Sequence, residues 1–224
     1  MGFDVVAFDL DGTLADTSAD LADALNYALD TLGRPRLPLD QITLMVGHGT
    51  RALMRKGLAA TGGGEDALTE AGLTELIGFY ERNICRHTSA YAGATEALDA
   101  LRALNIRTAI CTNKPERLAT MLVAALGWSD RFDAIIGGDT LVVSKPDAAP
   151  LLEAINRCGG GIAIYVGDSI TDADTARAAR VPFIAVSFGF RDRPVEELGA
   201  DYIVDSFDQL IGVMQRFEAR IDKD

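Results

Sequence analysis

Two groups of polar residues follow apolar runs and have side chains that could do chemistry. Asp9 and Asp11 lie two residues apart, so both carboxylates face one side if the chain is extended there. One carboxylate could attack an electrophile while the other donates or accepts a proton. Thr112 and Asn113 end another apolar run, just before an expected helix. A hydroxyl, an amide and free backbone N–H groups at a helix start suit an anion.

A third group, Asp168 and Asp172, lies about one helical turn apart. Carboxylates clustered with Asp9 would repel one another, by about 4 kcal/mol for a pair 4 Å apart at an effective dielectric of about 20. A divalent cation removes this repulsion, and oxygen ligands without a nearby Cys or His favour Mg²⁺. Lys145 also precedes an expected helix. The helix dipole does not stabilise a cation at that end, so the position of Lys145 needs another reason.

Short, continuously apolar runs alternate with helical patterns and predict the elements that would position these residues. Continuous apolarity is typical of strands buried on both faces of a parallel sheet. Because the carboxyl ends of such strands converge, we expect the polar groups to meet there. The pattern predicts an α/β fold with right-handed crossovers. The expected strands span about 5–8, 107–111 and 162–166, with weaker candidates at 134–136, 183–186 and 202–204, and the helices about 93–104, 115–126, 147–157 and 170–180.

Residues 15–90 break this rhythm, because they show helical stripes such as Leu21, Leu25 and Leu29 and no convincing strand. A chain of 224 residues is long for one ordinary domain and short for two. We therefore expect a core formed by residues 1–14 and 91–224, with a helical unit inserted at residues 15–90.

Composition excludes several classes of function. With 33 acidic residues against 21 Lys and Arg, the net charge is −12, and only four residues are Lys, which argues against a nucleic-acid partner. The three cysteines form no C-x-x-C pair, which indicates a reducing compartment. Neither a signal peptide nor a membrane-spanning run is visible. We expect a cytoplasmic protein, monomeric or homodimeric, with no membrane partner.

Taken in order, the segments 9–13, 112–113, 145–146 and 167–172 resemble the four motifs of the haloacid dehalogenase superfamily of phosphotransferases. The resemblance covers the whole chain and implies a Rossmann-like three-layer core with a parallel sheet. Residues 15–90 then correspond to the α-helical cap domain that this superfamily inserts after its first motif.

The resemblance also implies roles for individual residues. Asp9 would be the nucleophile that forms an aspartyl-phosphate, and Asp11 the general acid and then the general base. Thr112 and Lys145 would hold the phosphoryl group. The substrate side would also include Thr13 and Asn113, and Mg²⁺ would bind Asp9, the backbone carbonyl of Asp11, Asp168 and Asp172, the last as ligand or orienting group.

The segment 46–51 and the residues 137–140 resemble the phosphoglycolate phosphatase branch of the superfamily. The resemblance implies a small phosphorylated metabolite as substrate, 2-phosphoglycolate first, with His48, Thr50 and Arg51 as candidates to meet its carboxylate. The alternative is that Gly49 and Thr50 only cap a helix and that Arg51 is solvated.

Other activities use some of the same types of site residues. A sugar-phosphate phosphatase, for example for N-acetylmuramic acid 6-phosphate, or a phosphomutase would share the core chemistry. Dehalogenation is disfavoured because Asp11 supplies the proton-transfer group of phosphotransfer, and phosphonate hydrolysis because Lys56, the only lysine of the insertion, fits a solvated helix face. A signalling receiver domain also carries an acidic pair, a Thr and a Lys, but its phosphorylated Asp lies on a later strand than the pair.

Two local expectations concern helix ends. Arg180 stands where this superfamily usually has a glycine, so a left-handed helix stop would be strained there. Ser206 and Gln209 have the spacing of a capping box in front of the last helix.

Overall fold

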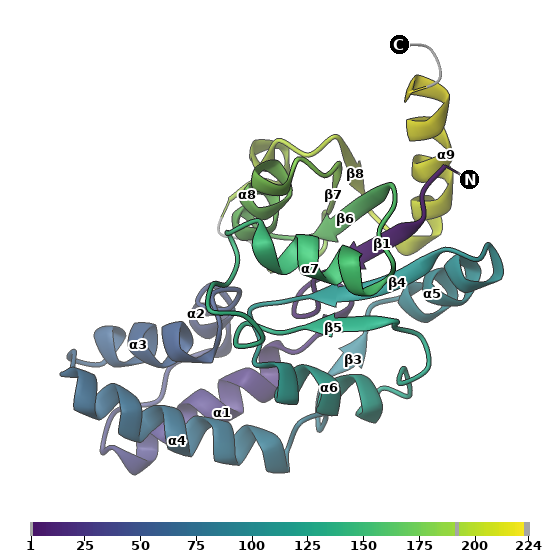
Figure 1. Ribbon diagram of the computed structural model, residues 1–224. Helices are drawn as coiled ribbons and strands as arrows, with labels where there is room; N and C mark the ends of the chain where they lie inside the picture. Colours follow the sequence, from purple (N-terminus) through teal and green to yellow (C-terminus); the bar gives the residue numbers. More distant parts are fainter. Residues whose placement is uncertain (1, 191–192, 222–224) are drawn as a thin grey trace.

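The computed structural model describes residues 2–190 and 193–221, and its centre is a sheet of six parallel strands (Figure 1). The strands lie in the order β5-β4-β1-β6-β7-β8. All six coincide, within one or two residues, with the apolar runs expected to be strands. Their bounds are β1 Val5–Phe8, β4 Arg107–Cys111, β5 Ala134–Ile136, β6 Ala163–Gly167, β7 Phe183–Val186 and β8 Tyr202–Val204.

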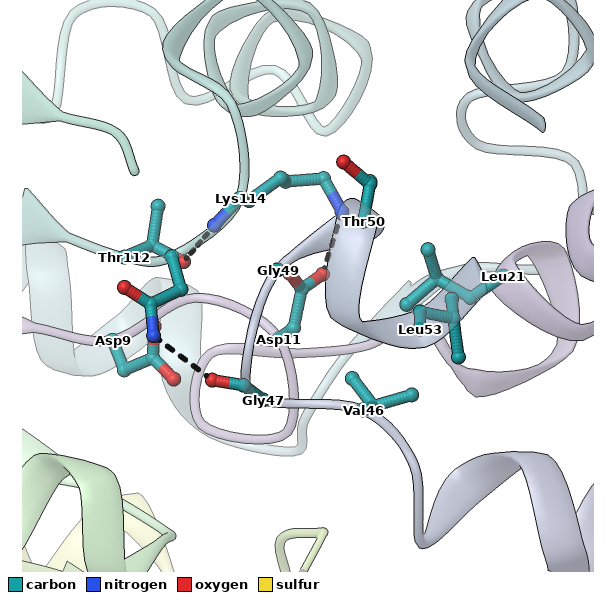
Figure 2. A pocket seen from close by; sticks show the side chains of 11 residues that line it. Asp9, Asp11, Leu21, Val46, Gly47, Gly49, Thr50, Leu53, Thr112 and Lys114 are labelled. Carbon is teal, nitrogen blue, oxygen red and sulfur yellow. Dashed lines mark hydrogen bonds and ion pairs between the residues drawn. The ribbon is translucent and has the colours of Figure 1, made fainter. Parts of the chain in front are cut away.

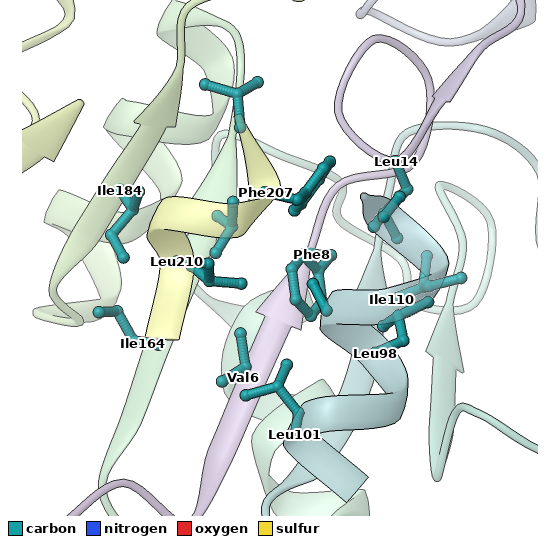
Figure 3. Close-up of a cluster of buried hydrophobic side chains, with 14 of the residues drawn as sticks. Val6, Phe8, Leu14, Leu98, Leu101, Ile110, Ile164, Ile184, Phe207 and Leu210 are labelled. Atoms are coloured by element: carbon teal, nitrogen blue, oxygen red, sulfur yellow. The ribbon is translucent and has the colours of Figure 1, made fainter. Parts of the chain in front are cut away.

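Helices cover both faces of this sheet, which explains why its central strand is apolar throughout. Val6 and Phe8 of β1 point into one cluster of buried side chains, shown in Figure 3, and Val5 and Ala7 point into the other. The first cluster is covered by α5 (Ala94–Ala103), α6 (Glu116–Ala125) and α9 (Leu210–Ile221), and the second by α7 (Ala149–Arg157) and α8 (Ile170–Ala179). The predicted α/β core of three layers is confirmed.

A group of helices between β1 and β4 has a hydrophobic core of its own and extends to one side of the sheet (Figure 1). Its buried side chains include Leu25, Met54 and Tyr80. The helices are α1 Ser18–Thr31, α2 Leu39–Thr43, α3 Thr50–Ala60 and α4 Asp66–Arg82. None of the helices among the described residues combines the length and the apolar character that crossing a bilayer requires.

The expectation that residues 15–90 contain no strand is wrong at both ends of this segment. β2 (Ala15–Asp16) and β3 (Ser89–Ala90) pair antiparallel where the chain leaves and re-enters the core. Next to this ladder, the buried carboxylate of Asp20 accepts hydrogen bonds from the backbone N–H groups of His87 and Thr88 and from the Thr88 hydroxyl, at 2.7–3.0 Å. The outgoing and returning chains are thus fastened to each other.

The two helix ends singled out in the sequence differ in outcome. Arg180 does end α8 in the left-handed conformation, at φ 55° and ψ 40°, although this conformation is strained for a residue other than glycine. The capping box of Ser206 and Gln209 is wrong, because the Gln209 side chain accepts the N–H of Asp205 and the turn Phe207–Gln209 is a 3₁₀ helix. A 3₁₀ turn closes its hydrogen bonds over three residues, which changes the spacing that a capping box needs.

Candidate active site

The polar groups singled out in the sequence follow three neighbouring strands. Asp9 comes directly after β1, Thr112 after β4 and Asp168 after β6, and β1 pairs in parallel with both neighbours. From β1 the chain builds outward through β4 to β5 and then crosses back to β6 on the other side of β1. Such a reversal of strand order opens a crevice at the carboxyl ends of the strands. The three side chains therefore share one edge of the sheet.

Asp9, Asp168 and Asp172 form a buried cluster in which one carboxylate oxygen of each residue lies within 4.8 Å of the other two. Desolvation, acting with the charges of Asp172 and Asp9, raises the pKa of Asp168 well above its usual value. Desolvation also raises the pKa of Asp9 to about 6, against the opposing effect of Lys145. The three carboxyl groups are costly to ionise together without a counter-charge. Their hard oxygen atoms are also suitable ligands for a divalent cation.

Two glycines allow the chain to approach Asp168 closely. A Cβ on Gly12, whose φ is +87°, would lie 2.5 Å from Asp168 Oδ2, and one on Gly189 would lie 2.2 Å from Asp168 Cβ. Either contact is too short for a real side chain. On the other oxygen, the Thr13 hydroxyl donates to Asp168 Oδ1 at 2.8 Å. The backbone therefore encloses this carboxylate, and Thr13 orients it.

Asp172 has protein partners on both carboxylate oxygens. Its Oδ1 lies 2.6 Å from Lys145 Nζ and 2.9 Å from the Tyr165 hydroxyl. Its Oδ2 accepts the Ser169 hydroxyl at 2.6 Å and the Ser169 N–H at 3.0 Å, and together these residues form the capping box of α8. Lys145 and these hydrogen bonds, working against desolvation, lower the pKa of Asp172. The geometry favours an orienting role for Asp172 over direct ligation of a metal.

The ammonium of Lys145 has three oxygen atoms close to it, two of which accept hydrogen bonds while the third, from Asp9, forms an ion pair. Nζ lies 3.0 Å from Asp9 Oδ1, 2.6 Å from Asp172 Oδ1 and 2.9 Å from the Tyr165 hydroxyl. Burial alone would lower the pKa of Lys145, but the two carboxylates hold it above its usual value. The side chain is thus a permanent, immobile charge beside Asp9, which explains its unusual position before α7.

Asp11 lies outside the carboxylate cluster and has a different cation. Lys114 Nζ donates to Asp11 Oδ1 at 2.7 Å and to the Tyr80 hydroxyl at 2.8 Å, and Figure 2 shows the first of these contacts. The Thr17 hydroxyl donates to the same Asp11 oxygen at 2.7 Å. Lys114 and Tyr80 are both buried. The two carboxylates of the first motif are therefore separated, each paired with its own lysine.

The loop after β4 is held by glycine contacts and by its own amide. A Cβ on Gly138 would lie 2.4 Å from the Asn113 carbonyl oxygen, so only glycine allows this approach. The Asn113 side-chain N–H groups donate to the carbonyls of Gly47 at 3.2 Å and Lys145 at 3.3 Å. Asn113 thus connects the helical insertion with the loop that carries Lys145, and its Oδ1 is buried without a hydrogen-bond partner.

Two adjoining cavities lie between the helical insertion and the sheet edge. The inner one, of about 20 Å³, is lined by Asp9, Asp11 and Thr112 from the core and by Gly47 and Thr50 from the insertion (Figure 2). That volume holds about one water molecule. The outer cavity, of about 430 Å³, shares Gly49, Thr50 and Asn113 with it.

The three residues of the insertion expected at the substrate lie in different places. Thr50 lines both cavities, whereas His48 and Arg51 line only the outer one. Arg51 forms an ion pair with Glu70, and both side chains are more than half exposed. His48 Nδ1 lies 3.2 Å from Lys56 Nζ. Of the three, only Thr50 reaches the chamber beside Asp9.

Reasoning from the sequence missed Lys114, Tyr80, Thr17 and Tyr165. Lys114 follows Thr112 and Asn113 directly, and its rarity as one of four lysines was a usable signal. Tyr80 lies 34 residues away and Tyr165 sits within an apolar strand, so neither has a local pattern that reveals its polar contacts.

Comparison with known proteins agrees with this fold. The family model of haloacid dehalogenase-like hydrolases matches residues 3–180. The chain belongs to this family of hydrolases, and the resemblance seen in its four motifs is thereby confirmed.

Two relatives and one solved structure are similar to the chain over most of its length. The chain is 42% identical over 205 residues to the phosphoglycolate phosphatase of Caulobacter vibrioides, covering 90% of this chain and 86% of that one. It is 40% identical over 222 residues to the phosphoglycolate phosphatase of Agrobacterium fabrum, covering 96% and 93%. A crystal structure described as a predicted phosphoglycolate phosphatase from Haemophilus somnus 129PT superposes with a TM-score of 0.90 at 25% identity, covering 96% and 99%.

Proposed function

We propose that the protein is a Mg²⁺-dependent phosphomonoester hydrolase whose substrate is 2-phosphoglycolate, cleaved to glycolate and phosphate. The observation that carries this proposal is the placement of Asp9 beside Lys145 and Asp168 at the mouth of three neighbouring strands. The substrate rests on the relatives of about 40% identity that bear the name phosphoglycolate phosphatase.

The residues support a transfer in two steps. A carboxylate oxygen of Asp9 attacks phosphorus while the bond from phosphorus to the substrate oxygen breaks, and the leaving oxygen takes the proton of Asp11. A water molecule then attacks the phosphorus of the aspartyl-phosphate and gives its proton to Asp11, and the bond to Asp9 breaks. Lys145 and the Thr112 hydroxyl hold the phosphoryl oxygens through both steps.

The donor set at the cluster fits Mg²⁺, which would neutralise the transferring phosphoryl group and its neighbouring carboxylates. Asp9 and Asp168 have oxygens available for it, together with the backbone carbonyl of Asp11, while Asp172 orients Lys145 and closes the cluster. Asp9 Oδ1 is buried with no hydrogen-bond partner, only the ion pair to Lys145.

Magnesium should raise thermal stability through this cluster. At a concentration about 100 times its Kd, a ligand of the native state stabilises it by about 2.7 kcal/mol, which corresponds to about 5–11 °C in Tm for a chain of this size. Differential scanning calorimetry with and without Mg²⁺ measures the shift. Asp168→Asn should strongly reduce this shift in Tm. Asp174 is about half exposed on α8, so Asp174→Asn should show the same shift as the wild type. Equal shifts in both variants would contradict the assignment.

We further propose that residues 15–90 act as a cap that opens to admit substrate. The inner cavity is too small for a phosphate group, and its walls come from both the core and the insertion. Movement of the insertion about the β2–β3 ladder would enlarge it. In the enlarged chamber the phosphate would lie beside Asp9, and the rest of a small substrate would extend past Thr50 toward the outer cavity.

His48 is the cap residue that we propose for recognition of the substrate carboxylate. Loss of its side chain should raise KM for 2-phosphoglycolate by about 10-fold, as for one lost hydrogen bond to a charged group, with little effect on p-nitrophenyl phosphate. Arg51→Ala should have a smaller effect, because Glu70 already pairs with that guanidinium. Steady-state kinetics of both variants on both substrates provide the test, and equal KM changes for the two substrates would refute recognition by His48.

A phosphate-release panel tests the function as a whole. The panel compares 2-phosphoglycolate, several sugar phosphates and phosphonoacetaldehyde, each with Mg²⁺ and with EDTA. We expect kcat/KM to be highest for 2-phosphoglycolate and release to stop with EDTA. Preference for a sugar phosphate would reassign the substrate, and activity that persists in EDTA would contradict the metal-dependent mechanism.

A further inference from the structure

We propose that Lys114 is the positioning residue of the general acid and base Asp11, and that Tyr80 couples it to the cap. The inference rests on the proposed function, because it concerns the group that exchanges protons with the substrate. Neither residue belongs to the four motifs, and neither lies in the carboxylate cluster beside Asp9.

The contact between Lys114 and Asp11 is buried and direct. The side chain of Lys114 is 1% exposed and that of Asp11 is 10% exposed, with 2.7 Å between Nζ and Oδ1. A charge in such a place needs partners to offset its lost hydration. Lys114 has one in Asp11 and a second in the Tyr80 hydroxyl, and its Nζ also lies 4.5 Å from the centre of the Tyr80 ring.

The lysine reaches Asp11 from the core, and its other partner comes from the insertion. Lys114 follows β4, whereas Tyr80 lies near the end of α4 and is fully buried. A second residue of the insertion, Thr17, donates its hydroxyl proton to Asp11 Oδ1. The position of the Asp11 carboxylate is therefore determined by groups from both parts of the protein.

The arrangement leaves one oxygen of Asp11 for chemistry. Both hydrogen bonds that reach this carboxylate among the described residues fall on Oδ1, from Lys114 and Thr17. Oδ2 is then the oxygen that donates a proton to the leaving group and takes one from water. Displacement of α4 moves the Tyr80 hydroxyl away from Lys114, so proper placement of Asp11 depends on the position of the cap.

Three variants separate positioning from folding. Lys114→Met removes the ammonium and keeps an unbranched side chain, and Tyr80→Phe removes one hydroxyl and keeps the ring. Tyr27→Phe is the matched control, since Tyr27 lies on α1 of the same insertion and stacks on Phe79, whereas the side-chain hydrogen bonds of Lys114 go to Asp11 and Tyr80. Each is assayed with Mg²⁺ on 2-phosphoglycolate and on p-nitrophenyl phosphate, whose leaving group needs no proton.

For Lys114→Met we expect kcat on 2-phosphoglycolate to fall about 100-fold with KM changed less than about threefold, since general acid–base catalysis contributes about 10² to 10⁴. On p-nitrophenyl phosphate the first step survives and the second lacks its base. A burst of nitrophenolate should therefore precede slow turnover, with aspartyl-phosphate accumulating in acid-quenched samples. Tyr80→Phe should show the same pattern more weakly, and Tyr27→Phe should match the wild type.

Two results would overturn the inference in an active enzyme. One is equal loss on both substrates without accumulation of the intermediate, which would indicate a structural role. The other is a change confined to KM, which would make Lys114 a substrate-binding group. A wild-type protein that releases no phosphate from any substrate would instead contradict the proposed function, and the role of Asp11 with it.

Discussion

Asp9→Asn should abolish phosphate release, with kcat falling by about 10⁴-fold or more, as for loss of an enzyme's nucleophile. The amide is isosteric with the carboxylate but cannot form the aspartyl-phosphate. Stability should be unchanged or higher, because Asp9 shares its cluster with two other buried carboxylates and burial already raises its pKa to about 6. Acid-quenched labelling with ³²P substrate and a thermal melt measure the two effects.

The control for this experiment is Asp174→Asn. Asp174 is about half exposed and pairs with Arg177 on the surface of α8, where ion pairs contribute little. It should keep full activity and form labelled intermediate. Retained phosphate release in Asp9→Asn would disprove the assignment of the nucleophile, and loss of the folded state would show that the Asp9 carboxylate stabilises the cluster instead of straining it.

Lys145→Met should lose activity and stability together. Its removal leaves Asp9 and Asp172 without their shared cation in a buried site, and breaking such a pair costs about 3–5 kcal/mol. For a chain of this length that corresponds to a fall in Tm of about 6–20 °C. Activity should fall because the phosphoryl group loses its fixed positive charge. Calorimetry and phosphate release measure the two losses separately.

A double variant distinguishes the electrostatic cause from a packing defect. Adding Asp172→Asn to Lys145→Met removes one of the two unpaired carboxylates, so part of the lost Tm should return while activity stays low. If the second substitution lowers Tm by as much in the variant as in the wild type, the two residues are not coupled. The ion pair would then not explain the stability of this region.

The fold was largely predictable from the sequence because most residues of the sheet are buried on both faces, and β1, β6 and β7 are buried throughout. Such strands appear as continuous apolar runs, and the stretch from Ala163 to Val166 shows this even though it includes Tyr165. The ladder of Ala15 and Asp16 with Ser89 and Ala90 was not predictable, because two residues per strand are too few to form a pattern. It is specified by the tertiary contacts of the insertion.

The site residues that directly follow strands were predictable from the sequence. Those that depend on partners from distant helices were not. Asp9, Thr112 and Asp168 follow apolar runs, and the topology of a parallel sheet brings such ends together. Lys114 resembles a surface charge in sequence, and only the fold places Tyr80 beside it. Arg51 was expected at the substrate, but its pairing with Glu70, one helix away, depends on how α3 packs on α4.

The β2–β3 ladder makes the helical unit exchangeable. Partners in an antiparallel pair lie about 5 Å apart, so the chain leaves the core at Asp16 and returns at Ser89 almost at the same point. For the six-stranded sheet, the segment between these residues is equivalent to a hairpin loop. A replacement segment of any length can be joined to the core if its two ends lie equally close together. Substrate range can therefore evolve, or be engineered, by exchange of this unit, provided that the graft keeps the partners that Thr17 and Tyr80 supply to Asp11 and Lys114.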